Sequence, residues 1–318
     1  MLATTDGIGA MNMLERIEAA GRVEEADVLA LRRAVYGEGD GTVTAADIEA
    51  VGALLDAAPE GPDDWRWLLR ECFEDHFLRQ SEPRGYFTDR GEAALLAITE
   101  PRNRPNRLRT HVLVHLLDKC AAAPRSLADR AMRLLEADVL ADHRICADDV
   151  AEVRRLLYAQ GSLNGLGICR GEADFLFDLN DHAGENADPA WSDLFSKAIT
   201  NHLLCAAGWR APEREVALRQ ERWASDTAVN VGDFMRRMIS FEGFGRRDRS
   251  CYWTERSEAM ARHEANGERL TPGQAEWLAD RLARDGRFCD AERALVAYLQ
   301  GVTGAALPEV LGPYLEAA

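Results

Sequence analysis

The chain has 318 residues, of which 47% are hydrophobic and 29% are charged, and its formal net charge at pH 7 is −16. This composition indicates a globular protein of roughly two domains and excludes an intrinsically disordered chain. Such an acidic chain repels nucleic acid and anionic lipid, and it has no apolar run near the ~18 residues of a membrane-spanning helix. We therefore expect no nucleic-acid partner and no membrane span.

Apolar residues recur at three- and four-residue spacing along the chain, which is the spacing of amphipathic helices. In chain order, the clearest helical segments are 26–37, 47–58, 65–78 and 127–140. Strand-like alternation is hard to find. The sequence therefore predicts an all-α fold.

The two halves of the chain resemble each other, which indicates an internal duplication. The matched residues keep their order, with only small drifts in offset. They include Val28/Val150, Tyr36/Tyr158, Trp65/Trp191 and His76/His202. We predict a tandemly duplicated helical bundle of the form A-B-A′-B′, with a first half at 1–140 and a second half at 141–318.

The second half carries an additional stretch, 206–264, which is locally rich in Arg, Met and aromatic residues. This stretch is interpreted first as a helical connector that packs onto the body of the protein. Two alternatives are a docking segment for an acidic or apolar partner and a helix that lies in a membrane interface.

A second recurring pattern, named here the helix-start motif, consists of a turn, a hydrophobic residue and, four residues later, an acid or amide. Its hydrophobic members are Val23, Val43, Ile145, Ile168, Leu270 and Phe288, with a degraded copy at Phe87. They come in pairs about twenty residues apart, which is typical of helical hairpins whose first residues lie side by side.

The motif has a structural interpretation as a helix cap. Thr44 and Asp47 have the spacing of a capping box, and Val43 with Ile48 has the spacing of a hydrophobic staple. An acid in the first helical turn also suits the helix macrodipole.

The motif also has an interpretation as the second half of an EF-hand calcium loop. No copy has a full ligand set, and Ca²⁺ takes six to eight oxygen ligands, so a normal EF-hand site is disfavoured. Weak or shared cation sites remain as an alternative. Their candidate ligands are Asp40, Asp47, Asp138, Asp142 and Asp149, with Asp285 and Glu292 in the last copy.

The repeated motif in an acidic all-helical chain, with RGEADFLFDLND followed by WSDLFSKAITNHL, resembles the TerB-like proteins associated with tellurite resistance. The resemblance covers most of the chain outside 206–264 and implies EF-hand-like helical hairpins and a role in metal-stress response. It implies metal binding by Asp40, Asp47, Asp142, Asp149, Glu172, Asp285 and Glu292. The stretch ITEPRNRPNRLRTHVL departs from the pattern, because Arg, Asn and Pro replace the acidic helix start.

Sequence motifs that would indicate catalysis are weak or missing. His111 and His115 have a spacing that zinc ligands use, but HVLVH lacks the glutamate of HExxH. There is no GxSxG, P-loop or dinucleotide motif, so we predict no enzymatic activity, no catalytic residue and no cofactor other than a divalent cation.

The seven cysteines include no CxxC pair and read as reduced thiols of a cytoplasmic protein. The leading hypothesis is a non-enzymatic cytoplasmic protein that binds a cation or acts in a metal or stress response through a protein partner. One alternative is a metal-independent scaffold that uses the repeat surface and 206–264. The other is an enzyme with a spatially assembled site.

Overall fold

The computed structural model describes residues 15–37, 41–57, 60–100, 107–159, 167–183, 186–204, 213–225, 270–303 and 307–317. These residues form helices joined by turns, and within them the only extended pairing is two isolated bridges, Arg22 with Glu60 and Ile145 with Ala187. The predicted all-α fold is confirmed. No helix in these ranges is long and apolar enough to cross a membrane.

The named helices have the following bounds: α2 Glu25–Tyr36, α3 Ala45–Ala57, α4 Asp63–Glu74 (continued by a π-helical turn, Asp75–Arg79), α5 Asp89–Ile98, α6 Arg107–Lys119, α7 Arg125–Asp142, α8 Ala147–Leu157, α9 Arg170–Ala183, α10 Pro189–Leu204, α11 Arg214–Ser225, α14 Pro272–Leu282, α15 Asp290–Thr303 and α16 Gly312–Ala317.

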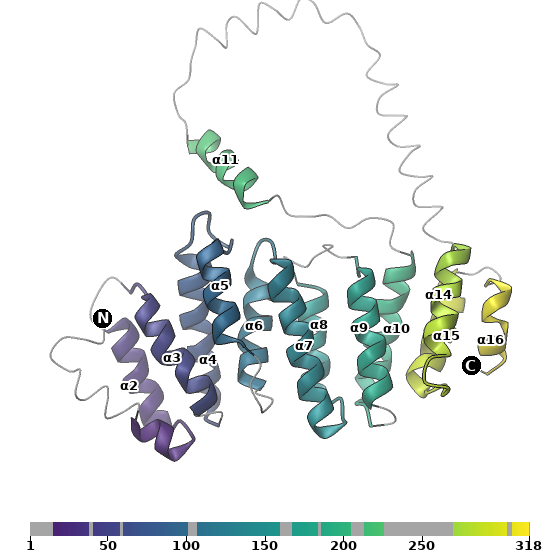
Figure 1. Ribbon diagram of the computed structural model, residues 1–318, viewed down its shortest axis with the longest axis horizontal. Helices are drawn as coiled ribbons and strands as arrows, with labels where there is room; N and C mark the ends of the chain where they lie inside the picture. Colours follow the sequence, from purple (N-terminus) through teal and green to yellow (C-terminus); the bar gives the residue numbers. More distant parts are fainter. Residues whose placement is uncertain are drawn as a thin grey trace, which may run out of the picture.

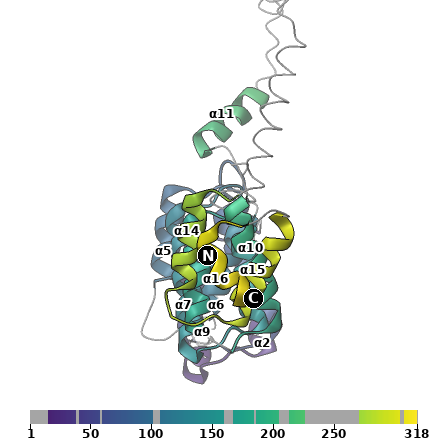
Figure 2. The same cartoon turned by 90° about the vertical axis from the view of Figure 1, so that its right-hand side faces the viewer.

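The helices stack side by side in an elongated row, with α2 near one end and α16 at the other (Figure 1). One layer of the row contains α2, α4, α6, α8, α10 and α15, each packed on the next. The second layer contains α3, α5, α7 and α9, and contacts such as α6 with α7 and α9 with α10 join the layers. Figure 2 looks along this row from its C-terminal end. Stacked helix pairs of this kind are the arrangement of α-solenoids.

The hydrophobic core is continuous along the row. Buried apolar side chains form one cluster that extends from Ile17 to Leu311, and its largest members, Trp65 and Trp191, are fully buried. The predicted domain boundary at residue 140 lies near the end of α7, and α7 packs on both α8 and α9 beyond it. The helices therefore continue as one row across this boundary.

Residues that match between the two halves make matching contacts. His76 donates from Nδ1 to the carbonyl of Val43, and His202 donates from Nδ1 to the carbonyl of Ile168, both at 2.8 Å. Each histidine thus ties the end of one helix to the start of another. This structural role explains why a histidine recurs at the matched position, and it requires no bound ligand.

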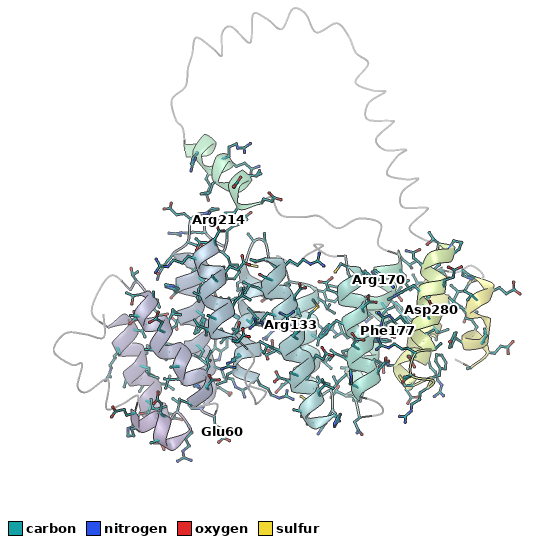
Figure 3. The ribbon with its side chains drawn as sticks, in the orientation of Figure 1. Glu60, Arg133, Arg170, Phe177, Arg214 and Asp280 are labelled. Carbon is teal, nitrogen blue, oxygen red and sulfur yellow. The ribbon has the colours of Figure 1, made fainter. Side chains whose placement is uncertain are left out.

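The insertion 206–264 is described only over α11 and residue 213. Arg214, labelled in Figure 3, donates from Nε and Nη2 to the carbonyl of Glu82, at 3.1 and 2.6 Å. This contact joins α11 to the loop after α4. The Arg- and Met-rich part of the segment, 232–253, lies outside the described residues.

Candidate functional site

The helix-start motifs share one backbone geometry. In five copies, the degraded copy at Phe87 included, the residue two positions before the hydrophobic member is left-handed. These residues are Gly21, Gly41, Gly85, His143 and Gly286, with φ of 68°, 76°, 84°, 49° and 70°. Glycine adopts this conformation without steric cost because it has no Cβ atom, whereas the Cβ atom of His143 clashes with the following carbonyl. The left-handed residue reverses the chain direction, so that the hydrophobic member of the motif, two residues later, packs against the core.

The acids of the motif lie at the third helical position and accept a hydrogen bond from the backbone N–H of the N-cap residue. Asp27, Asp47, Asp149, Glu172, Gln274 and Glu292 all make this bond, at 2.7–3.0 Å. In α3, the N–H of Asp47 in turn donates to Thr44 Oγ1 at 3.3 Å, which completes a capping box. These contacts support the capping interpretation.

Burial changes the acidity of two of these caps. It raises the pKa of Glu292 to about 7, and it raises the pKa of Glu172 as well. A carboxyl group out of water favours its neutral form, and a single backbone hydrogen bond offsets only part of that cost.

The remaining predicted metal ligands are scattered. Asp40 lies outside the described residues. Asp285 accepts from the backbone N–H of Arg287 at 2.9 Å, within its own turn. In the described part of the chain, no three His, Cys, Asp or Glu side chains are grouped so as to hold a metal ion. Metal binding by the motif acids therefore stays a prediction.

One predicted set of acids does converge, and it converges on an arginine. Asp138, Asp142 and Asp149 come from α7 and α8, and Arg107, the first residue of α6, reaches into them. Its Nη1 lies 2.5 Å from Asp149 and its Nη2 lies 3.3 Å from Asp142. Asp138 also accepts from Thr110 Oγ1 at 2.6 Å, and burial raises the pKa of Asp138 to about 6. The Arg107 guanidinium thus lies among the carboxylates for which the sequence predicted a metal ion.

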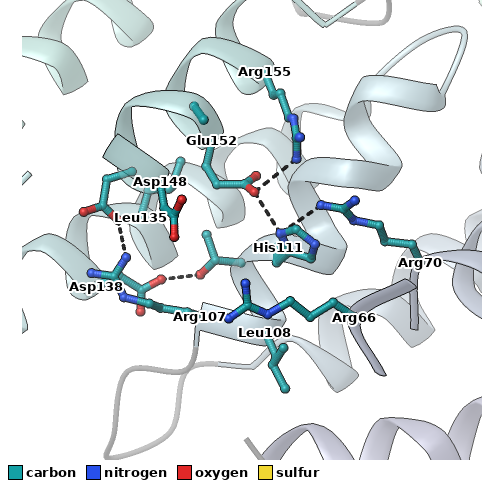
Figure 4. A pocket seen from close by; sticks show the side chains of 13 residues that line it. Arg66, Arg70, Arg107, Leu108, His111, Leu135, Asp138, Asp148, Glu152 and Arg155 are labelled. Carbon is teal, nitrogen blue, oxygen red and sulfur yellow. Dashed lines mark hydrogen bonds and ion pairs between the residues drawn. The ribbon is translucent and has the colours of Figure 1, made fainter. Parts of the chain in front are cut away.

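Arg107 forms one end of a cleft of about 470 Å³ between α4, α6, α7 and α8 (Figure 4). This volume is in the range of small-molecule sites. The side chains that line the other end are Arg66 and Arg70 from α4, His111 from α6, and Asp148, Glu152 and Arg155 from α8. The cleft thus concentrates four arginines in a chain of net charge −16.

Glu152 is shared between two groups in this cleft. Its Oε1 accepts from His111 Nδ1 at 2.8 Å and lies 3.2 Å from Arg155 Nη1. Its buried Oε2 has no hydrogen-bond partner among the described residues. Arg70 Nη2 lies 3.4 Å from the same His111 nitrogen. That nitrogen already donates to Glu152, so it provides Arg70 with no acceptor.

The arginines of α4 lack carboxylate partners. Among the described residues, neither Arg66 nor Arg70 forms a salt bridge, and the buried Nε of Arg70 has no partner. Arg70 lies 5.1 Å from the ring centre of Trp67, whose side chain is 60% exposed. Burial, followed by the charge of Arg155, lowers the pKa of Arg70. This end of the cleft therefore has unbalanced positive charge beside an exposed aromatic ring.

Sequence reasoning did not identify this cleft. Two histidines of interest, His111 and His115, do lie near it, but each faces a carboxylate: His115 Nε2 is 2.8 Å from Glu74 Oε2. Burial lowers the pKa of His115. The one available signal was the i, i+4 spacing of Arg66 and Arg70 on α4, which places both arginines on one face of the helix.

Comparison with known proteins provides no further assignment: no family model, curated protein or solved structure matched this chain. The resemblance to TerB-like proteins therefore stays a prediction.

Proposed function

We propose that the protein is a non-enzymatic, metal-independent binding scaffold, the alternative hypothesis drawn from its sequence. The observation that carries this proposal is the cleft between α4, α6 and α8, where Arg66 and Arg70 form no ion pair with any described carboxylate and Trp67 is exposed beside them. Trp and Arg are the residues that most often dominate binding interfaces. Stacked helix pairs offer extended surfaces for such recognition.

Metal independence is supported by the hydrogen bonds and ion pairs that the motif carboxylates already form within the protein. The motif carboxylates bind backbone N–H groups, and Arg107 lies between Asp142 and Asp149. A metal ion at this cluster would have to displace a guanidinium already in contact with two carboxylates. No separate observation favours the cation-binding or the enzymatic hypothesis.

We also propose that the row arose by duplication of a half containing two or more helix pairs. The matched bonds of His76 to Val43 and of His202 to Ile168 support this, as do the matched buried tryptophans. The TerB-like relationship, with its link to tellurite and metal stress, belongs to the same proposal and rests on sequence alone.

The test of the proposed function compares full-length variants in crosslinking and capture from the cells that produce the protein. Trp67→Ala and Arg70→Gln are expected to lose the same partner that the unchanged protein retains. Tyr298→Ala is the matched control, because Tyr298 is an exposed aromatic residue of α15, at the far end of the row. Equal capture by all variants, or loss with Tyr298→Ala as well, would contradict recognition through this face.

A further inference from the structure

The charge balance at the α4 end of the cleft points to one class of ligand. Arg66, Arg70 and Arg155 carry three positive charges, and within the described part of the chain Glu152 is the only carboxylate that forms an ion pair with any of them. Arg66 and Arg70 lie one turn apart on α4, and Arg155 reaches from α8 toward Glu152 and His111, on the side where Arg70 lies (Figure 4). Asp148 also lines this part of the cleft, so three guanidinium groups face two carboxylates and a net charge of +1 remains.

The polar atoms in this part of the cleft are also incompletely bonded. Arg70 Nε, His111 Nε2 and Glu152 Oε2 are buried and have no hydrogen-bond partner among the described residues. Buried polar atoms without partners are rare in native proteins. Arg70 Nε is the donor among these three, because Glu152 Oε2 is an acceptor and a neutral His111 that donates from Nδ1 has an acceptor at Nε2. An anion that accepts from Arg70 Nε would remove the cost of this unpaired donor.

We propose that Arg66, Arg70 and Arg155 bind a dianionic oxyanion, a phosphate group, in the cleft between α4 and α8. Guanidinium groups suit this ligand because their planar N–H donors match the oxygens of phosphate. A phosphate also offers several oxygens, so it can accept hydrogen bonds from more than one guanidinium group, whereas a carboxylate has two oxygens. This inference rests on the proposed use of the cleft for recognition, and it names the chemistry recognised there.

Other charges in the cleft set a limit on affinity. Asp148, one turn before Glu152, lines the cleft and repels an anion. Asp138 and Asp149 contribute less, because Arg107 lies against them at the opposite end. Replacing Asp148 should therefore strengthen binding, which is the opposite sign to replacing an arginine.

The experiment is calorimetric titration of the full-length protein with inorganic phosphate at constant ionic strength, in chloride buffer above pH 7. We expect saturable binding with a Kd on the order of 1 mM or tighter. Arg66→Gln and Arg70→Gln should each weaken it by at least about tenfold, as expected for the loss of a hydrogen bond to a charged group. Asp148→Asn should strengthen it.

The control is Arg133→Gln, which makes the same charge change at an exposed position of α7 outside the cleft. It should bind phosphate as the unchanged protein does. Arg66 is itself exposed, so its variant should fold normally. Sulfate should compete with phosphate, whereas acetate should bind at least about tenfold more weakly, because it has one charge in place of two.

Three results would overturn the inference: absence of saturable phosphate binding, equal weakening by Arg133→Gln, or acetate binding as tightly as phosphate. Failure of the proposed function would look different. Trp67→Ala would then leave partner capture unchanged, whatever the outcome with phosphate. A small phosphate compound and a phosphorylated partner are distinguished by whether phosphate competes with the captured protein.

Discussion

The capping interpretation makes a quantitative prediction at Asp149. This buried carboxylate accepts from the N–H of Cys146 at 2.9 Å through one oxygen and contacts Arg107 through the other. Asp149→Ala removes both contacts. The unpaired backbone N–H costs about 1–3 kcal/mol, and the lost pair with a half-exposed arginine adds about 0.5–1 kcal/mol. We expect a destabilisation of about 1.5–4 kcal/mol.

Asp149→Asn separates the two contributions. The amide oxygen can still accept from Cys146, so only the ion pair is lost and the cost should fall to about 1 kcal/mol. The neighbouring Asp148→Ala is the control: Asp148 is exposed at the first turn of the same helix, so its replacement should cost less than about 0.5 kcal/mol.

The assay is urea denaturation followed by circular dichroism, with free energies of unfolding taken from the midpoints and slopes. The predicted order of stability is unchanged protein, Asp148→Ala, Asp149→Asn and Asp149→Ala, from highest to lowest. If Asp149→Ala unfolds at the same urea concentration as Asp148→Ala, the acid does not cap the helix and the reasoning is refuted.

Three further predictions concern single positions. The pKa of Asp138 is raised to about 6 by burial, so the folded state binds its proton more tightly than the unfolded chain and gains stability as pH falls from 7 toward 4. Asp138→Asn should therefore be more stable than the unchanged protein at pH 7, by up to about 3 kcal/mol at 1.4 kcal/mol per pKa unit. The difference should vanish near pH 4, and the same difference in urea melts at pH 4 and pH 7 would contradict this. Trp191 donates from Nε1 to Asn180 at 3.1 Å, whereas the buried Nε1 of Trp65 has no partner within the described ranges. Trp191→Phe should therefore cost about 1 kcal/mol more than Trp65→Phe in the same assay, and equal costs would refute it. His143 is left-handed, so His143→Gly should raise the free energy of unfolding by up to about 1 kcal/mol, and a loss of stability would show that the turn is not strained.

The features that sequence predicted well are local. A capping box extends over four consecutive residues, so Thr44 and Asp47 could be paired without knowledge of the fold. The amphipathic spacing of the helices is equally local, and it predicted the all-α class. The matched histidines were visible in sequence, but their bonds to the carbonyls of Val43 and Ile168 span 33 and 34 residues and needed the structure.

The cleft could not be predicted, because its contacts are long-range. Arg70, His111 and Glu152 are each 41 residues from the next, on three different helices. Arg107 shows the same limitation. It lies in the stretch ITEPRNRPNRLRTHVL, where the sequence departs from the helix-start motif because Arg, Asn and Pro replace the acidic residues. In the fold, this arginine provides the positive charge for acids that belong to another copy of the motif.

The claim that the motif acids are structural is tested most directly by thermal melts of chelator-stripped protein, with Ca²⁺, Mg²⁺, Zn²⁺ or Mn²⁺ added singly and native mass spectrometry on the same samples. A cation that binds only the folded state raises the melting temperature by mass action. The account predicts no saturable shift and no bound ion. A saturable shift with one ion that Asp47→Asn or Asp149→Asn abolishes would contradict it and restore the cation-binding hypothesis.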